Sequence, residues 1–429
     1  MIRARLRTIA RALVLAALGA DVHGCAQQQE FDLVVAGGSV ADGSGGDLRR
    51  ADVGIRGDRI SAIGNLSGRT TGNAIDATGK IVAPGFIDVA SRSGVSLLAA
   101  ASGESHLRQG ITSEILGENS PAFWTAATAD TGALQRAGMT LDWSGLNGYF
   151  AKLESRGTAI NVGTLVPLSL ARAAADENAF IDAAMRDGAF GVMDDVDANA
   201  TELTPAATVA GRYDGLAMVR AESPLASDDA ALIAVGSQTH RIVISGLSRL
   251  PPGDAVSDVV RRIVRAGQQK VDVWGAVSPY PPKPGASDLG IREALKYGGM
   301  MIGTDTAAVS GASARPDTPP AAFGAFPRLL GQLSRDEHLV DFREAIRRNT
   351  SGVASVFRIA QRGIIRENYF ADLVVFDPRT IADRATFEQP NQYPAGIDYV
   401  LVNGVVVVTP KGLTGARPGT RLVRRLSPR

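Results

Sequence analysis

Residues 241–277 read RIVISGLSRLPPGDAVSDVVRRIVRAGQQKVDVWGAV. Two short apolar runs, which end at Ser245 and Val277, flank a segment with helical periodicity. Asp254 can cap a helix there, and the apolar residues of the segment form one stripe at three- and four-residue spacing: Val256, Val259, Val260, Ile263 and Val264. This succession of strand, helix and strand predicts a parallel β/α unit whose helix packs on the strands.

The same alternation recurs through residues 83–360. Apolar runs that predict strands end near eight residues: Val89, Leu116, Val166, Met193, Val219, Ser245, Val277 and Gly303. Eight such runs with helical segments between them predict an α/β fold of the (β/α)8 TIM-barrel type. Because the chemistry of such barrels takes place at the carboxyl ends of the strands, the residues that follow these runs are the candidate site residues.

The two ends of the chain differ from this central part. Short β-rich runs separated by Gly-rich turns lie at residues 31–35, 52–55 and 59–63, as in a meander of antiparallel strands, and return at 371–376 and 399–408. We therefore expect a small β-sandwich domain built from residues 26–82 and 361–429, beside the barrel. A chain of 429 residues is long enough for a large domain with such a satellite.

Composition narrows the range of partners. The 45 Lys and Arg residues nearly balance the 44 Asp and Glu residues, so the chain has no basic field that would attract nucleic acid. Cys25 is the only cysteine. An intramolecular disulfide and cysteine-based zinc motifs are therefore excluded.

Residues 1–25 resemble an export leader. Four arginines supply a positive start, and Ala12–Ala20 supply an apolar core that is too short to span a bilayer. Val22-His23-Gly24-Cys25 resembles a bacterial lipoprotein cleavage box, in which the cysteine becomes lipidated, although His23 fits it poorly. We expect a protein exported to the periplasm or anchored to the membrane through Cys25 alone. The alternative is that Cys25 is a spare thiol of a removed leader.

Several segments resemble one known family. They are Gly79–Val89 (GKIVAPGFIDV), Gly303–Asp305, Gly324–Arg328, Arg362–Ile365, Ala371–Pro378, Asp383–Phe387, Gly396–Gly404 and Thr414–Gly419. Together they are similar to the D-aminoacylase (N-acyl-D-amino-acid deacylase) branch of the amidohydrolases. The resemblance covers most of the chain after Phe31 and is strongest from Gly303 onward. It implies a hydrolase of C–N bonds other than peptide bonds.

The resemblance also implies a zinc site, which this sequence supplies poorly. In the family one or two zinc ions activate a water molecule, and an aspartate after strand eight, matched here by Asp305, transfers the proton. The positions of four family ligands are occupied by other residues: Ala90, Arg92, Met218 and Gly246. Glu118, after strand two, could be a carboxylate substitute. Because zinc sites depend on nitrogen, sulfur or carboxylate ligands in sufficient number, we expect no resident cofactor.

Three other residues match the family's substrate-binding pattern: Arg220 and Glu222 after strand five, and Tyr280 in a Pro-Tyr turn after strand seven. The family's substrate-binding lysine falls on Ser248. Asp305 follows Tyr280 after only 25 positions. The family usually carries a long insertion there that covers the active site.

The chain has four histidines, at positions 23, 106, 240 and 338. His23 is in the leader, and His240 precedes its strand, which puts it at the wrong end of a barrel for a ligand. His106 and His338 lie in polar segments. We expect a solvated or structural role for all of them.

Two functions are compatible with these residues. The first is a D-aminoacylase-like protein with a degraded zinc site, inactive as a metallo-deacylase, which acts as an exported binding or scaffold protein for a small-molecule ligand at the barrel mouth. The second is an active hydrolase of N-acyl-D-amino acids or related amides that uses a sparse or metal-free site around Asp305, Glu118 and Arg220. Metal content and turnover of N-acyl-D-amino acids discriminate between them.

Charge predicts what fills the former metal position. Strands one and eight are neighbours in a closed barrel, so Arg92 and Asp305 emerge at the same mouth. An ionised carboxylate that is buried without a partner is destabilising. A guanidinium can bind such a carboxylate through two hydrogen bonds. We expect Arg92 to pair with Asp305 or Glu118. The alternative is that Arg92 points into solvent and Asp305 bonds to backbone amides or Arg220.

Overall fold

The computed structural model describes residues 30–117, 134–135, 138–250, 254–268, 270–310 and 314–425. The leader with Cys25 and the ligand candidate Glu118 lie outside these residues.

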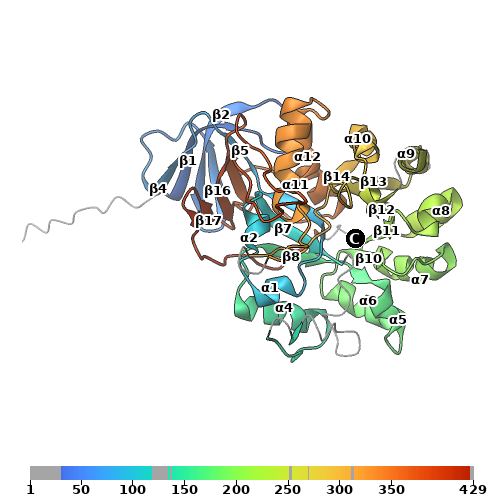
Figure 1. Cartoon of the computed structure of the whole chain (residues 1–429). Coiled ribbons are helices and arrows are strands. Elements are labelled where there is room, and N and C mark those ends of the chain that lie inside the picture. The colour runs from blue at the N-terminus through green and yellow to red at the C-terminus, as the bar shows by residue number, and fades with distance from the viewer. Residues whose placement is uncertain are drawn as a thin grey trace, which may run out of the picture.

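Parallel strands form the barrel expected from the sequence (Figure 1). In chain order they are β6 (Phe86–Ser91), β7 (Ile111–Leu116), β8 (Asn161–Thr164), β9 (Val166–Pro167), β10 (Gly191–Asp194), β11 (Leu216–Arg220), β12 (Arg241–Ser245), β13 (Asp272–Val277) and β14 (Met300–Ile302). Because β8 and β9 are separated by Leu165 alone, they occupy one strand position. The described strands therefore fill eight positions of the barrel. Each position ends within two residues of the end expected from the sequence.

Backbone hydrogen bonds close the barrel. The strands form two bonded sets, β6 to β8 and β9 to β14, and the consecutive strands β8 and β9 join them at one seam. At the other seam the amide of Asp305 donates to the carbonyl of Ala90 (3.0 Å), and the amide of Arg92 donates to the carbonyl of Thr306 (2.9 Å). The segment after β14 therefore runs beside the end of β6.

Helices follow the strands and form the outer layer seen in Figure 1. The α-helices are α1 (Ser96–Ala99), α2 (Glu104–Leu107), α4 (Gly145–Arg156), α5 (Leu168–Arg172), α6 (Glu177–Arg186), α7 (Ala200–Gly211), α8 (Asp229–Thr239), α9 (Asp254–Gln268), α10 (Leu289–Lys296), α11 (Ala321–Arg328), α12 (Phe342–Arg348) and α13 (Ser351–Val356). The described residues also form two 3-10 helices, η1 (Pro224–Ser227) and η2 (Leu247–Arg249), and a π-helix, η4 (Leu329–Asp336).

The predicted helix stripe is largely correct. On α9, Val256, Val259 and Ile263 are buried and Val260 is partly buried, which fixes this helix to β13. Val264 is 44% exposed, so its assignment to the stripe was wrong. It lies one residue beyond Ile263, at the edge of an apolar face that is only about 100° wide.

The inside of the barrel is filled with apolar side chains rather than open to water. Ala90 and Met218 belong to this inner cluster, together with Val353 of α13 and Phe357, which follows α13. An inner core of this kind is what stabilises an eight-stranded barrel.

Both ends of the chain build the small domain, as expected; the blue and red strands lie side by side in Figure 1. Its strands are β1 (Phe31–Val40), β2 (Arg49–Arg56), β3 (Arg59–Gly64), β4 (Thr71–Asp76), β5 (Ile81–Pro84), β15 (Leu373–Phe376), β16 (Ile397–Val402), β17 (Val405–Thr409) and β18 (Gly412–Leu413). β1 to β3 are an antiparallel meander, whereas β4 and β5 both pair parallel to β1. β1 can pair with both because residues 31–36 of β1 pair with β4, whereas Ser39 and Val40 pair with β5.

The Asn403-Gly404 turn joins β16 to β17, and both of its residues have positive φ (48° and 78°), as a two-residue hairpin requires. In the described part of the chain no helix is both long and apolar enough to cross a membrane.

Candidate functional site

The barrel mouth, where the strands have their carboxyl ends, brings Arg92 and Asp305 together. Arg92 Nε donates to Asp305 Oδ1 at 2.9 Å, and Arg92 Nη2 binds the same oxygen. The pairing expected from the sequence is therefore confirmed. The backbone bonds across the β6–β14 seam hold both residues in position, and Asp305 has a φ of 56°, which is unfavourable for a residue other than glycine.

A second arginine, Arg249 at the end of η2, binds the other oxygen of Asp305. Its Nη1 lies 2.5 Å from Asp305 Oδ2, and its Nε donates to Glu222 Oε1 at 2.5 Å. Sequence reasoning missed this residue. A Cβ atom on Gly246, three residues earlier, would collide with the Arg249 guanidinium. The absence of a side chain at a family ligand position therefore leaves the space that Arg249 fills.

Two of the three residues matched to substrate binding, Arg220 and Glu222, already have charged partners at the mouth. Arg220 Nη2 donates to Asp197 Oδ1 at 2.5 Å, and Glu222 accepts from Arg249. Among the described residues, the mouth thus contains three arginines and three carboxylates in paired contact: Arg92, Arg220 and Arg249 with Asp305, Glu222 and Asp197. The charges of this network cancel. Its arginines are therefore less available to an anionic substrate than unpaired arginines would be.

The remaining family ligand positions are apolar. Ala90 and Met218 are 3% and 0% exposed, and both pack in the inner barrel cluster. Within the described ranges, no group of three or more His, Cys, Asp or Glu side chains could hold a metal ion. The side chains around Asp305 are guanidinium cations, which cannot ligate a metal ion, instead of imidazoles. The described residues at this mouth therefore do not fit zinc.

Tyr280 does not take part in the arginine network. Its hydroxyl donates to Asp383 Oδ2 at 2.6 Å, and the Arg328 guanidinium lies 4.8 Å from the centre of its ring. The side chain is buried, and burial together with the Asp383 carboxylate raises the pKa of the Tyr280 hydroxyl. These contacts join the barrel to the segment around Asp383.

A fully buried polar cluster lies beside the mouth, and sequence reasoning missed it as a unit. His106 Nδ1 lies 2.8 Å from Glu114 Oε1 and 3.9 Å from Asp88 Oδ2, while His106 Nε2 faces Thr306 Oγ1 at 3.3 Å. Ser91 donates to Glu114 as well. The structural role expected for His106 fits this position. His240 and His338 are exposed.

Charge pairing in this cluster opposes the effect of burial. Burial alone would lower the pKa of His106, but the Glu114 charge and hydrogen bond outweigh it and raise that pKa. Burial likewise would raise the pKa of Glu114, and His106 together with bonds from Ser91 and Ser93 lowers it. For Asp88, the effect of burial outweighs the attraction of His106 and raises the pKa of the carboxyl to about 6. His106 and Glu114 therefore form a buried ion pair.

Known proteins resemble this chain over nearly its whole length. D-aminoacylase from Alcaligenes xylosoxydans xylosoxydans is 30% identical, over 92% of this chain and 98% of the relative. N-acyl-D-glutamate deacylase from the same organism is also 30% identical, over 93% and 97%. The amidohydrolase family profile matches residues 236–408.

This chain belongs to the amidohydrolase family, in the D-aminoacylase branch.

Solved amidohydrolase structures agree with that placement. A crystal structure of D-aminoacylase superposes with a TM-score of 0.78 at 26% identity, covering 92% of this chain and 100% of that chain. N-acyl-D-glutamate deacylase from Bordetella bronchiseptica, solved with zinc and a phosphonate inhibitor, gives 0.79 at 27% identity, covering 91% and 99%. The barrel with a satellite β-domain is therefore the fold of this branch.

The D-aminoacylase relative is longer than this chain where the two are compared. Their alignment spans 484 positions, more than the 429 residues present here, so the relative has residues without a counterpart in this amidohydrolase. This difference is in the direction expected from the short interval between Tyr280 and Asp305.

Loss of the Arg92 guanidinium should weaken the fold moderately. In Arg92→Ala the Asp305 carboxylate keeps Arg249 but loses its partner across the barrel seam. We expect the free energy of unfolding to fall by about 1–2 kcal/mol, between the values of exposed and buried pairs. Chemical denaturation followed by circular dichroism measures it.

Arg186→Ala is the matched control, because Arg186 forms an i,i+4 pair in which its own side chain is 65% exposed. Its effect should stay within about 0.5 kcal/mol. Equal stability of Arg92→Ala and Arg186→Ala would mean that the Arg92–Asp305 pair has no energetic role.

Proposed function

We propose that this amidohydrolase does not carry out zinc-dependent deacylation and instead acts as an exported protein that binds a small molecule at its barrel mouth. The observation that carries the proposal is the state of Asp305, whose two oxygens each accept from a different guanidinium. A carboxylate so engaged is a poor ligand for a dication and a poor acceptor for a proton from water.

Electrostatics supports the same proposal. A zinc ion next to Asp305 would stand beside Arg92 and Arg249, and repulsion between a dication and two cations is several kcal/mol at distances of a few ångströms near a protein surface. The four family ligand positions offer no compensation, since they supply two apolar side chains, one glycine and one arginine: Ala90, Met218, Gly246 and Arg92.

Metal analysis paired with turnover tests the proposal. We expect less than about 0.1 zinc per chain in protein purified with zinc in the medium. We also expect no turnover of N-acetyl-D-glutamate, N-acetyl-D-aspartate or N-acetyl-D-leucine above that of the matched variant Asp305→Asn.

About one zinc per chain, lost in Asp305→Asn together with turnover, would overturn the proposal in favour of an active deacylase. Turnover without metal that disappears in Asp305→Asn would support the second hypothesis, a metal-free hydrolase.

The location of the protein forms a separate part of the proposal. We propose that residues 1–25 direct export and that Cys25 carries the only membrane anchor. In cell fractionation the wild type should then enter the detergent-extracted membrane fraction, whereas Cys25→Ser should be found with soluble exported proteins. A wild type that is already soluble after export contradicts lipidation and leaves export intact.

A further inference from the structure

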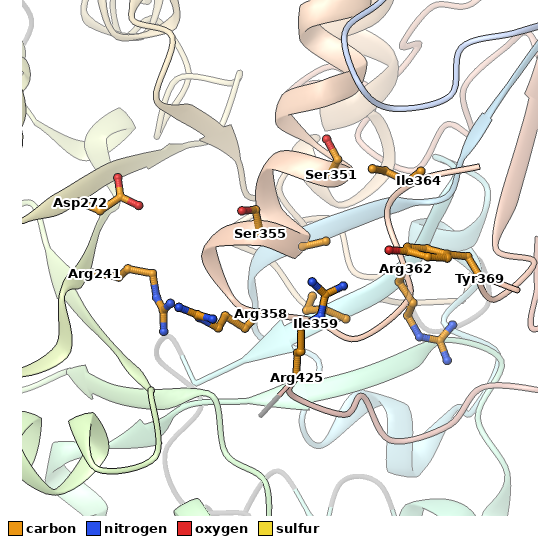
Figure 2. A pocket seen from close by; sticks show the side chains of 11 residues that line it. Arg241, Asp272, Ser351, Ser355, Arg358, Ile359, Arg362, Ile364, Tyr369 and Arg425 are labelled. Carbon is orange, nitrogen blue, oxygen red and sulfur yellow. The ribbon is translucent and has the colours of Figure 1, made fainter. Parts of the chain in front are cut away.

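A cavity of about 420 Å³ lies at the opposite end of the barrel from Asp305. Its lining includes Arg241 and Asp272, the first residues of β12 and β13, whereas the mouth residues follow the ends of the strands. The other side is formed by the segment from α13 onward and by the C-terminal segment, with Ser355, Arg358, Tyr369 and Arg425 (Figure 2).

Cations gather on one side of this cavity around a single carboxylate. Arg241 Nη2 lies 3.0 Å from Asp214 Oδ1, and Arg358 Nε lies 2.8 Å from Asp214 Oδ2. The two guanidinium groups point toward one another in Figure 2. The next positions along the C-terminal segment, Arg424 and Arg425, bring two more arginines to the same side.

Positive charge exceeds negative charge here. The cavity wall contains four arginines, and a fifth, Arg424, lies near Asp214 and Arg241 without lining the cavity: the four are Arg241, Arg358, Arg362 and Arg425. Three carboxylates stand against these five cations, Asp214, Asp272 and Asp372, which leaves two positive charges in excess. Burial lowers the pKa of Arg241 and of Arg424, and each is lowered further by a neighbouring arginine. The cluster is therefore electrostatically strained as it stands.

Two donors in this cluster also lack acceptors. Over the described residues, Nε of Arg241 and Nε of Arg424 are buried without a hydrogen-bond partner, and the Arg241 side chain is only 9% exposed. A buried donor without a partner is destabilising, and an anion with several oxygens in the cavity would offset the excess positive charge next to Arg241.

We propose that this cavity binds the phosphate group of a small molecule, with Arg241, Arg358 and Arg425 as its cationic side. A phosphate dianion matches the two excess charges, and the planar fork of arginine suits its oxygens. Ser355 supplies a hydroxyl from α13, and Tyr369 with Ile364 supplies a flatter, less polar wall on which an organic group could rest. The site is independent of the function proposed for the barrel mouth.

A purely structural role would require fewer arginines. The amino-terminal face of such barrels usually serves stability, and Asp214 with one arginine would be enough for a staple between β12 and the segment after α13. Asp214 is instead bonded by two arginines, Arg241 and Arg358, and both of them line the cavity together with Arg425. This excess of cations on a cavity wall indicates a ligand.

Isothermal titration of the full chain with inorganic phosphate tests the proposal at low ionic strength. The wild type should bind one phosphate per chain, and Arg425→Gln and Arg358→Gln should each weaken binding about tenfold or more, the usual effect of losing a charged hydrogen-bond donor. Arg425 is exposed, so Arg425→Gln should fold even if Arg358→Gln does not.

Arg56→Gln is the matched control, since it removes the same charge from an exposed residue that does not line the cavity. Its phosphate affinity should stay within about twofold of the wild type. Absence of binding at about 10 mM phosphate overturns the proposal. An equal loss of affinity in Arg56→Gln and Arg425→Gln overturns it too, because it reduces the binding to general attraction between charges.

Phenyl phosphate distinguishes the source of the phosphate group. Binding of phenyl phosphate about tenfold tighter than inorganic phosphate, with the difference lost in Tyr369→Ala, supports a phosphate ester as the ligand. Equal affinities support free phosphate. Failure of both anions to bind the wild type contradicts the site altogether.

Discussion

Replacing His106 with phenylalanine is expected to lower the free energy of unfolding by about 3–5 kcal/mol, the effect of removing one member of a buried ion pair. Phenylalanine has a ring of similar outline but cannot donate to Glu114. The Glu114 carboxylate would then stay buried, fully inaccessible to water, with only the neutral hydroxyls of Ser91 and Ser93 as its remaining side-chain donors within the described residues. Urea denaturation measures the loss.

Variants of Glu114 and of an exposed glutamate separate the contribution of the His106–Glu114 pair from that of removing a carboxylate anywhere. Glu114→Gln alone should destabilise, because His106 loses its countercharge, whereas Glu293→Gln removes an exposed carboxylate on α10 and should change stability by less than about 0.5 kcal/mol. Adding Glu114→Gln to His106→Phe should restore part of the loss, because a stranded charge is replaced by a neutral amide. Strictly additive losses would contradict the ion pair.

The pair also predicts a pH dependence. The raised pKa of His106 gives stability that is complete below its ordinary value of 6.5 and is lost as pH rises through the folded pKa. The lowered pKa of Glu114 gives stability that is complete above its ordinary value of 4.5 and is lost as pH falls. The difference between wild type and His106→Phe should therefore be largest between about pH 5 and 6.5.

Asp88 also affects how stability depends on pH, because its carboxyl lies near the imidazole of His106. Burial raises its pKa to about 6, so its own contribution falls as pH rises from about 4 to 6. Above about pH 6 the Asp88 anion adds to the attraction on His106. A difference between the two proteins that stays flat from pH 4 to 8 would mean that His106 is neutral in the fold.

The fold could be predicted because the spacing of apolar residues can be read within each segment of the sequence on its own. The strand ends and the stripe of α9 follow from apolar spacing alone, and closure of eight strands then places Arg92 beside Asp305. The parallel pairing of β4 and β5 with β1 was not predictable in the same way. It depends on which segments, about 40 residues further along the chain, pair with the first and the last part of β1.

The only contact of the site that could be predicted from the sequence is the one between residues on neighbouring strands, Arg92 and Asp305. Arg249 lies in a turn after β12, and nothing in its own neighbourhood indicates that Gly246 leaves space for its guanidinium to reach Asp305. His106 lies in a polar segment whose four-residue helix has no clear apolar face, so its complete burial was not visible. Contacts of this kind depend on segments about 50 to 200 residues apart.

Removal of the Arg362 guanidinium is the second change with a large expected effect, because it breaks a buried junction between the small domain and the barrel. Arg362 binds Asp372 and donates to Asn403 Oδ1 at 2.8 Å, and Asp372 also accepts from the Asn403 amide at 2.8 Å. Asn403 in turn reaches Asn161 of β8 at 2.8 Å, so the junction extends into the barrel.

We expect Arg362→Ala to lower the free energy of unfolding by about 3–5 kcal/mol, because the Arg362 and Asp372 side chains are only 3% and 4% exposed and the stranded carboxylate cannot reach water. Arg379→Ala is the control, since it breaks an Arg–Asp pair whose arginine is 78% exposed, and it should be nearly neutral. A loss below about 1 kcal/mol in Arg362→Ala would show that Asn403 and Asn161 satisfy Asp372 without the cation. The buried junction at Asp372 would then be held by apolar packing and neutral hydrogen bonds.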